Sequence, residues 1–181
     1  MATEDEQFAA IFREIHPRLC RFLEGLLGDP SSAQDLAQEA FLRLHRFGCE
    51  RLPPNESRFW LFRVARNLAL NELTRRQTRT KFAARVASLF SIGSRAGATP
   101  EEQLAQAEQT QLAARLLVIL PADQRAALLL REQEGMSYAE IARALDISES
   151  KVKVDIFRAR QALRARWHEL TKKEPQARAR G

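Results

Sequence analysis

The chain has 181 residues, of which 45% are hydrophobic and 29% charged, and its formal net charge is +6. A chain of this length can form one helical domain or two small ones. Its positive net charge favours a polyanionic partner, and nucleic acid is the leading candidate. The acidic beginning MATEDEQ is not a signal peptide and no apolar run is long enough to cross a bilayer, so we expect a cytoplasmic protein that does not insert into membranes.

Helical spacing of hydrophobic residues predicts an all-α fold, because no alternation of apolar and polar residues is long enough for a strand. A first helix is predicted over residues 4–27, and Gly28, Asp29 and Pro30 end it. Ser31 or Ser32 is expected to cap a second helix that runs to about residue 47. This helix has two regular faces. The outward face combines charged side chains with a leucine, and it could be either a binding surface or simply a solvated surface. The inward face is Ala37, Ala40, Phe41 and Leu44, and the outward face is Asp35, Gln38, Glu39 and Leu42.

Residues 48–57 are rich in Gly, Pro and Asn and are predicted to form a loop, after which Ser57 caps a helix over residues 58–79. One face of this helix interleaves an aromatic ring, amides and cations. Such groups stack on unpaired bases, bond base edges and hold phosphates of single-stranded nucleic acid. The alternative is that Trp60 packs in the core and the arginines are solvated, which is favoured for Trp60 taken alone. The residues of this face are Trp60, Arg63, Asn67, Asn71 and Arg75.

The helical pattern of apolar residues weakens over residues 81–98, where small residues are common, and this favours a flexible linker. Thr99, Pro100 and Glu102 then provide an N-cap, a first-turn proline and a capping-box glutamate, so a new helix begins there. It is expected to reach residue 120, with another over residues 121–134 and a break at Gly135. We therefore divide the chain into a first domain at 1–80, the linker at 81–98, a second domain at 99–170 and a disordered tail at 171–181.

Residues 136–166 are predicted to form two helices joined by a tight turn, the layout of a helix-turn-helix DNA-binding motif. Ser137 and Glu140 make an S-x-x-E capping box that starts the first helix at Tyr138, and Asp146 ends it. Ser148 is the expected N-cap of the second helix. A helix held in this way can lie in a major groove while the first helix crosses the DNA backbone.

The second helix of this motif has a buried face and an outward stripe, both at helical spacing. The alternative is an ordinary helical hairpin with a solvated basic face, and the motif alone does not decide between the two. The buried face is Val152, Ile156, Ala159 and Leu163, the outward stripe is Lys151, Val154, Asp155 and Arg158, and the flanking residues suited to phosphates are Lys153, Arg160, Arg164 and Arg166.

Residue types that serve catalysis or metal binding are not arranged as a site. Cys20 and Cys49 have neither a metal-ligand spacing nor the count of a disulfide framework, so both are expected to be reduced. His16, His45 and His168 are scattered, and no nucleophile triad or glycine-rich phosphate-binding pattern is present. We therefore predict no enzymatic activity, no cofactor, no metal and no small-molecule substrate.

Three segments, in this order, resemble the extracytoplasmic-function (ECF) sigma factors, the bacterial subunits that direct RNA polymerase to promoters. The family's polymerase-binding segment is similar to LLGDPSSAQDLAQEAFLRL, and its promoter-melting segment is similar to FWLFRVARNLALNELTRR. Its second domain is similar to LPADQRAALLLREQEGMSYAEIARALDIS followed by FRARQALR. The resemblance implies a sigma region 2 helical bundle, a flexible linker and a sigma region 4 helix-turn-helix. It further implies that core RNA polymerase and promoter DNA are partners, and that a separate anti-sigma factor controls the protein.

The resemblance also implies a role for each outward face. The second helix would grip the coiled-coil clamp of the largest polymerase subunit, and the helix at 58–79 would engage the minus-ten element. The loop at residues 55–57 would cradle a flipped-out base, whose unpairing costs about a few kcal/mol. The linker would thread toward the active-site and RNA-exit channels of the polymerase. The implied residues are Asp35, Gln38, Glu39, Phe41 and Leu42 for polymerase, and Asn55, Ser57, Trp60, Arg63, Arg66, Asn67, Asn71, Arg75 and Arg76 for the minus-ten element.

The helix that would read the minus-thirty-five element departs from the family. Members commonly carry a Gly-Thr pair and a Ser-Arg pair where this sequence has Ser150-Lys151 and Val154-Asp155. Asp155 either accepts a hydrogen bond from a cytosine amino group or pairs with Lys151 or Arg158, and the pairing is slightly favoured. Val154 could contact a thymine methyl group, so the promoter sequence stays open. The implied residues are Ser150, Lys151, Lys153, Val154, Asp155 and Arg158.

Two other classes of function compete with a sigma factor. A freestanding repressor or activator would use the same helix-turn-helix, but it gives the outward faces of the first domain no role and would not co-purify with core polymerase. A DNA recombinase would need a serine or tyrosine nucleophile among arginines, and the only tyrosine, Tyr138, lies in the first turn of a helix. A sigma factor is therefore the favoured hypothesis.

Overall fold

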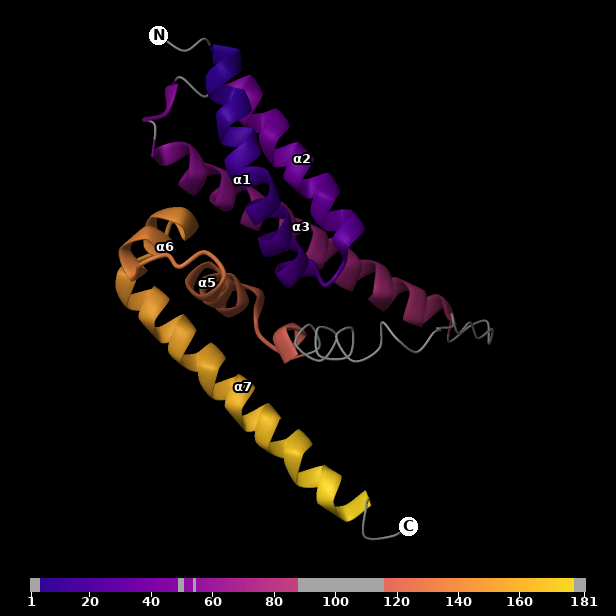
Figure 1. Cartoon of the computed structure of the whole chain (residues 1–181). Helices are drawn as coiled ribbons and strands as arrows, with labels where there is room; N and C mark the ends of the chain where they lie inside the picture. The colour runs from indigo at the N-terminus through magenta and orange to yellow at the C-terminus, as the bar shows by residue number, and fades with distance from the viewer. Residues whose placement is uncertain (1–3, 49–50, 54, 88–115, 178–181) are drawn as a thin grey trace, which may run out of the picture.

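The computed structural model describes residues 4–48, 51–53, 55–87 and 116–177, with side chains for 5–48, 51–53, 55–79 and 116–169. Figure 1 shows α1, α2 and α3 bundled as a first unit, and α5, α6 and α7 as a second unit beside it. No strand occurs in these ranges, so the all-α prediction is confirmed, and none of their helices is long and apolar enough to cross a membrane. The helices are α1 (Glu4–Leu27), α2 (Pro30–Phe47), α3 (Glu56–Ala87), α5 (Ala122–Glu132), α6 (Tyr138–Leu145) and α7 (Glu149–Ala177).

The turn between α1 and α2 is fixed by Gly28 and Asp29. Gly28 has a φ of +68°, a conformation that a residue with a Cβ adopts only with strain. The Asp29 carboxylate accepts hydrogen bonds from the backbone N–H of Ser31 at 3.2 Å and from the hydroxyl of Ser32 at 2.5 Å, and Pro30 takes the first helical position. The predicted cap at Ser31 or Ser32 is therefore wrong, because Asp29 already starts the helix.

The first unit buries one apolar core between its three helices. Phe22 of α1 and Phe62 of α3 meet edge to face, with ring centroids 5.3 Å apart, and both are fully buried. The predicted inward face of α2 is buried as a whole: Ala37, Ala40, Phe41 and Leu44.

Helix α3 begins earlier and ends later than the sequence predicted. It starts at Glu56, so Ser57 lies inside the helix with 1% of its surface exposed and does not cap it. It ends at Ala87, so residues 81–87, assigned to the linker, are helical. These seven residues are KFAARVA, in which no Gly or Pro occurs and Ala, Arg and Lys favour helix, so nothing forces the helix to stop where its apolar pattern weakens.

The second unit closes a smaller core between α5, α6 and α7. Helix α7 runs to Ala177, so residues 171–177, predicted to belong to a disordered tail, are helical. The stretch is TKKEPQA, and its Lys and Glu favour helix whereas Pro175 does not. The predicted helix over 99–120 lies outside the described residues except for 116–120, as do residues 88–98 of the predicted linker. The buried residues of this core include Leu130, Met136, Ile141, Leu145, Val152, Ile156 and Ala159.

The two units pack against each other, α3 against α6 and α1 against α5 (Figure 1). Helices α1 and α5 pack tightly at Gly25, where a Cβ would lie 2.8 Å from a methyl carbon of Leu129. Arg125 of α5 is 5% exposed and donates to the carbonyl of Leu26 in α1 at 2.5 Å and to that of Leu120 at 2.9 Å. Burial lowers the pKa of this guanidinium, because it removes water from the charge.

Candidate nucleic-acid interface

The helix-turn-helix is held by the local bonds that the sequence predicted. Ser137 Oγ accepts from the N–H of Glu140 at 3.2 Å, and the Glu140 carboxylate accepts from the N–H of Ser137 at 2.8 Å, which completes the capping box and lowers the pKa of Glu140. Asp146 ends α6 in the left-handed region, with a φ of 58°. Ser148 Oγ accepts from the N–H of Lys151 at 3.2 Å where α7 begins. These bonds fix where α6 ends and the candidate reading helix α7 starts.

Asp155 is the one residue of the predicted outward stripe that lies inside. It is 5% exposed, and its carboxylate accepts a hydrogen bond from Lys151 Nζ at 2.6 Å. The prediction that it faces outward is wrong, because Asp155 lies three residues after Val152 and four before Ala159, on the buried side of α7. Of the two roles left open, the structure contains the pairing with Lys151, and the buried carboxylate presents no surface to a base.

The rest of the stripe faces solvent, on a helix that lies on the far side of the second unit from the first (Figure 1). Val154 is 44% exposed, and Phe157, which the sequence analysis did not single out, is 61% exposed. Because Phe157 follows Val154 by three residues, helical spacing could have predicted that the two side chains share one face. An apolar pair on this surface suits thymine methyl groups. The exposed residues of the predicted set are Ser150, Lys151, Lys153, Val154 and Arg158.

Two of the flanking arginines are paired within the second unit. Arg160 donates to Glu132 at 2.6 Å, and this bond raises the pKa of Arg160. Arg166 donates to Glu169 at 2.7 Å. These pairs are solvent-exposed and therefore weak, so both arginines can exchange a carboxylate for a phosphate at little cost.

The predicted base-stacking face of α3 divides into an exposed part and a covered part. Asn67, Asn71 and Arg75 are exposed. Trp60 is half-buried, and its ring stacks on Phe47 with centroids 5.6 Å apart and an interplanar angle of 27°. Trp60 therefore lies neither in the core nor fully in solvent, and its ring is stacked on that of Phe47 near the surface.

Arg63 and Arg66 form the covered part, because the second unit lies over them. Arg66 forms an ion pair with Asp123 of α5. Arg63 donates to the carbonyl of Arg143 in α6, and it lies 3.8 Å from the carboxylate of Asp146. Sequence patterns could not predict these bonds, because their partners are 57 to 83 residues away and belong to the other unit.

Arg76, which was also predicted for the minus-ten element, holds the first unit together. Its guanidinium donates to the Asp29 carboxylate at 3.0 Å, to the Ser32 hydroxyl at 2.6 Å and to the Glu72 carboxylate at 3.1 Å. The bond from Ser32, followed by that from Arg76, lowers the pKa of Asp29. Arg76 thus ties α3 to the turn between α1 and α2 and is not part of the exposed stripe.

The loop before α3 opens onto a polar hollow of about 400 Å³ where the two units meet. The guanidinium carbons of Arg58 and Arg143 lie over the ring of Phe59, 4.5 and 4.8 Å from its centroid. Ser57 Oγ is buried and has no hydrogen-bond partner. The predicted base-cradling loop therefore faces the second unit in this arrangement. The hollow is lined by Glu14, Asn55, Arg58, Phe59, Glu140 and Arg143.

The outward face of α2 reaches the surface as predicted. Asp35 and Gln38 are exposed, Leu42 is 53% exposed, and the partly exposed Glu39 accepts from Arg43 at 2.7 Å. Phe41, predicted on the inward face and implied at its edge for polymerase binding, is 3% exposed and lies in the core. Its ring packs edge to face on two neighbours, Phe8 with centroids 6.1 Å apart and Phe12 at 4.8 Å, and the 37% exposed Phe12 is the aromatic that reaches the surface there.

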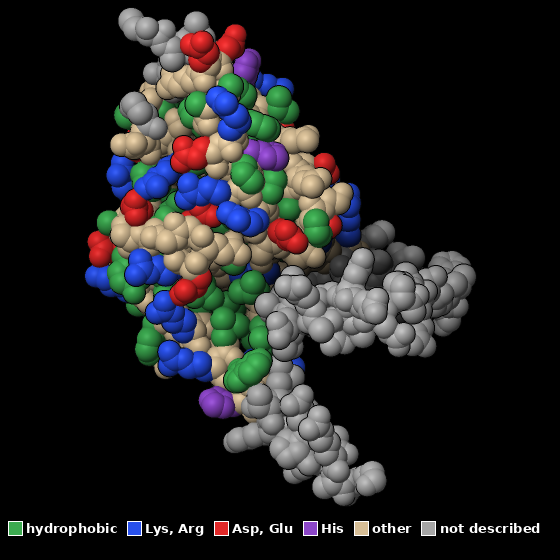
Figure 2. All heavy atoms as spheres, in the orientation of Figure 1, with side chains coloured by type: hydrophobic (Ala, Val, Ile, Leu, Met, Phe, Trp, Pro, Cys, Tyr) green, Lys and Arg blue, Asp and Glu red, His purple; other side chains and the backbone are tan. Residues whose placement is uncertain are grey.

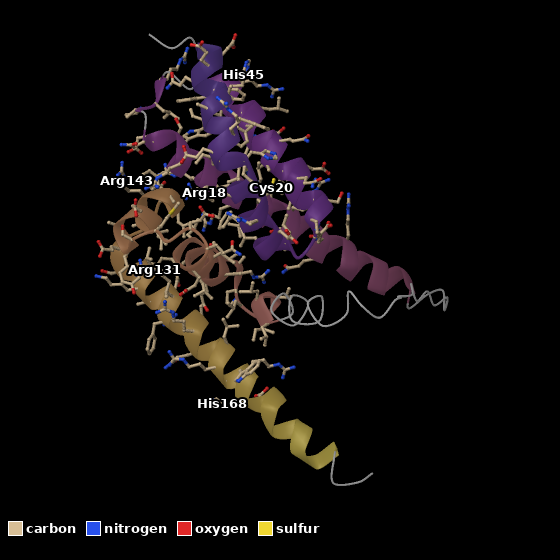
Figure 3. All side chains as sticks on the ribbon, viewed as in Figure 1. Arg18, Cys20, His45, Arg131, Arg143 and His168 are labelled. Carbon is tan, nitrogen blue, oxygen red and sulfur yellow. The ribbon has the colours of Figure 1, made fainter. Side chains whose placement is uncertain are left out.

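Thiol and imidazole groups do not assemble into a site within the part of the chain that the structure describes. Figure 3 shows Cys20 and His45 on the first unit and His168 far from both, on α7. Burial raises the pKa of the Cys20 thiol, which lies 3.8 Å from the His16 ring nitrogens, while Cys49 lies outside the described residues. No cluster of three or more His, Cys, Asp or Glu that could hold a metal occurs among the described residues.

Residues 11–79 match the Sigma-70 region 2 family, and residues 110–163 match the Sigma-70 region 4 family. The chain is 35% identical over 136 residues to the ECF RNA polymerase sigma-E factor of Haemophilus influenzae, with 71% of each chain covered. It is 38% identical over 144 residues to the RNA polymerase sigma-H factor of Pseudomonas aeruginosa, covering 75% of this chain and 72% of that one. Its fold is similar to that of the sigma factor RpoE solved in complex with the anti-sigma factor NepR from Bartonella quintana, with a TM-score of 0.66, 21% identity, and 87% and 94% of the two chains covered.

Proposed function

Because the chain belongs to the extracytoplasmic-function sigma factors, non-enzymatic subunits that direct core RNA polymerase to promoters, we propose which of its surfaces performs each step. Helix α2 would bind polymerase, α3 would bind the melted minus-ten element, and α7 would read the minus-thirty-five element. The main support for this assignment is that α2 and α3, in the segment matching region 2, and α7, in the segment matching region 4, each expose a face of different chemical character.

The polymerase-binding face is proposed to be the outward side of α2. Leu42 is half-exposed among polar neighbours, and Gln38 and Asp35 lie on the same face one and two turns before it. An apolar group ringed by polar ones is the pattern of an interface centre with a wet rim. Phe12 borders this face from α1 and would extend the apolar contact, in the role first assigned to Phe41.

The minus-ten face is proposed to be the outer side of α3. Asn67 and Asn71 can bond base edges, Arg75 can hold a phosphate, and the Trp60 ring lies on the same helix for stacking. Arg63 and Arg66 would join them once the second unit moves away.

The minus-thirty-five face is proposed to be the exposed stripe of α7. Lys151 and Arg158 supply cations, and Val154 with Phe157 supplies apolar contact to thymine methyl groups. Asp155 would act indirectly, because its carboxylate holds Lys151 and does not itself reach the groove.

We further propose that the chain works in the cytoplasm, where core polymerase transcribes, and that an anti-sigma factor controls it. The support for this control is the likeness in fold to a sigma factor solved with its anti-sigma partner. Such a partner would have to cover at least one of the three faces to block transcription.

Assembly with core polymerase separates this proposal from a freestanding DNA-binding regulator. The purified chain is mixed with core RNA polymerase and passed over a size-exclusion column, and we expect the two to elute together. Leu42→Glu places a charge at the centre of the proposed interface and should weaken binding at least tenfold. Val118→Glu is the matched control, since Val118 is 57% exposed on the other unit and should leave binding unchanged. A chain that binds DNA but never elutes with core polymerase would be a regulator of the other class.

A further inference from the structure

Two aromatic rings stack where α2 ends and α3 begins, at one end of the first unit (Figure 1). Phe47 is the last residue of α2, and Trp60 lies in the second turn of α3. Their ring centroids are 5.6 Å apart and the angle between the rings is 27°, so the rings are nearly parallel. Trp60 is half-buried and packs against the core, whereas Phe47 is 40% exposed. Phe47 is therefore the outer ring of the pair.

The end of α2 leaves the ring of Phe47 partly uncovered. Gly48 caps the helix with a φ of +88°, which suits glycine, and its N–H donates to the carbonyl of Leu44 at 3.0 Å. In a longer helix, the residues three and four positions after Phe47 would pack beside its ring. Because the helix ends at Phe47, no helical neighbours of this kind follow it.

The position of Phe47 distinguishes it from an ordinary exposed hydrophobic residue. Single apolar side chains on a surface are common and need no special explanation. Phe47, however, is stacked on a residue of the proposed minus-ten face, and it comes shortly before the loop that would hold a flipped-out base. The ring pair therefore extends the minus-ten face of α3 onto the end of α2.

A short stretch of one strand could contact both the ring pair and the amides of α3. Trp60 and Asn67 are seven residues apart, which places them two helical turns and about 10 Å from each other along the helix axis. Stacked nucleotides rise by about 3.4 Å each. A base on the ring pair would thus lie about three nucleotides from a base at Asn67.

Stacking would also supply what the surface charge does not. Figure 2 shows basic and acidic side chains interleaved over the visible face of the molecule, so phosphates find no continuous basic track on that face. A planar ring, by contrast, binds the face of an unpaired base at one fixed position. A base inside a duplex already has stacked neighbours and gains nothing comparable.

We propose that Phe47 forms a stacking platform for one unpaired base of the minus-ten element, with Trp60 supporting its ring from the core side. The inference rests on the proposed sigma function, because it requires α3 to bind the melted strand. Every base has a π-face, so the platform rewards an unpaired base of any identity and favours melting over the reading of sequence. The ring pair is formed within the first unit alone, so the platform needs no contribution from the second.

Removal of the aromatic face of Phe47 tests the platform. Holoenzyme assembled from core polymerase and the full chain is titrated into a labelled single-stranded oligonucleotide that carries the minus-ten element of a promoter recovered from a randomised library. Phe47→Leu keeps an apolar side chain but removes the ring, so affinity for this oligonucleotide should fall at least about fivefold. Phe47→Trp keeps a ring and should retain the affinity. Trp167→Leu is the matched control, because Trp167 is 50% exposed on α7 in the other unit, and it should leave the affinity unchanged.

An abasic scan decides whether a base is the partner of the ring. One base of the oligonucleotide is removed at a time, and affinity is measured for the unaltered chain and for Phe47→Leu. At one position, the loss seen with the unaltered chain should be nearly absent in Phe47→Leu, because the two changes remove the same contact. At all other positions the losses should be equal. Full affinity of Phe47→Leu, equal losses at every position, or a Phe47→Trp variant as weak as Phe47→Leu would each overturn the platform.

Initiation measurements separate the platform from the sigma function. Phe47→Leu should elute with core polymerase as the unaltered chain does, and loss of this assembly would place Phe47 in polymerase binding and overturn the platform. In reconstituted transcription, Phe47→Leu should initiate at least about fivefold less on a fully paired template, and the deficit should shrink on a template whose minus-ten region is mismatched and already open. Equal initiation by both chains on the paired template would refute the platform alone, whereas failure of the unaltered chain to initiate would refute the sigma function.

Discussion

Replacing Asp155 by asparagine removes the charge that restrains the candidate reading helix and keeps the volume of the side chain. The Asp155 carboxylate is 7% exposed and accepts from Lys151 Nζ at 2.6 Å, while the lysine side chain is 47% exposed. Since the lysine lies half in water, screening leaves about 0.5 kcal/mol for a pair at this spacing, roughly a twofold preference for the paired rotamer. The free energy of unfolding should therefore change by less than about 1 kcal/mol, as lost pairing and relieved desolvation offset each other.

Binding to duplex DNA should change more than stability does. The released Lys151 is free to reach a phosphate about twice as often, so the slope of log affinity against log salt should become more negative, by at most about 0.9 for one full phosphate contact. Fluorescence anisotropy with a labelled promoter duplex, repeated from low to high salt, measures this slope. Asp5→Asn is the control, because it makes the same substitution at an exposed residue of α1, in the other unit and away from α7. An unchanged slope, together with a loss of about 1–3 kcal/mol of discrimination at one base pair, would refute this role and make Asp155 a reader of cytosine.

Three further predictions concern packing, capping and pH. Gly25→Ala gains about 1 kcal/mol of helix propensity inside α1 but places a methyl group 2.8 Å from Leu129, so crowding should cancel the gain and leave Tm unchanged by calorimetry; a rise in Tm of about 3 °C would contradict the close approach. Ser137→Ala removes the capping box and should cost about 1 kcal/mol in urea unfolding, whereas the exposed Ser150→Ala should cost less than about 0.5 kcal/mol. The pKa of Glu140 is lowered from 4.5, chiefly by the bond from the Ser137 N–H, so its contribution to stability is complete above pH 4.5 and is lost as pH falls below that value through the lowered pKa. Glu140→Gln should flatten the dependence of the free energy of unfolding on pH in that window, and an unaltered acid limb would contradict it.

Features set by neighbouring residues could be predicted from the sequence. The capping box of Ser137 and Glu140, the end of α6 at Asp146 and the cap at Ser148 depend on bonds within three or four residues, and all are present. The buried residues of α2 followed from helical spacing alone, since one side of this helix contacts the rest of its unit. Local chemistry was sufficient for these features, but the N-cap of α2 was assigned to Ser31 or Ser32, although Asp29 lies within the same turn.

Features set by contacts between helices could not be predicted in the same way. Asp155 lies at the border of a helix face, where the arc that neighbouring helices cover decides between core and surface. The structural role of Arg76 depends on Asp29, 47 residues away, whose own role as an N-cap was missed. The junction between the units, typified by Arg18 and Glu134, joins residues 116 positions apart and leaves no periodic signal in the sequence.

Reconstituted transcription on a promoter library tests the central claim most directly. The chain is added to core RNA polymerase with templates whose minus-ten and minus-thirty-five positions are randomised, and the transcripts are sequenced. We predict transcripts that depend on the chain and start downstream of two preferred motifs, one for each DNA-binding face. Transcription no greater than that of core polymerase alone, or transcripts with no sequence preference at either element, would contradict the account.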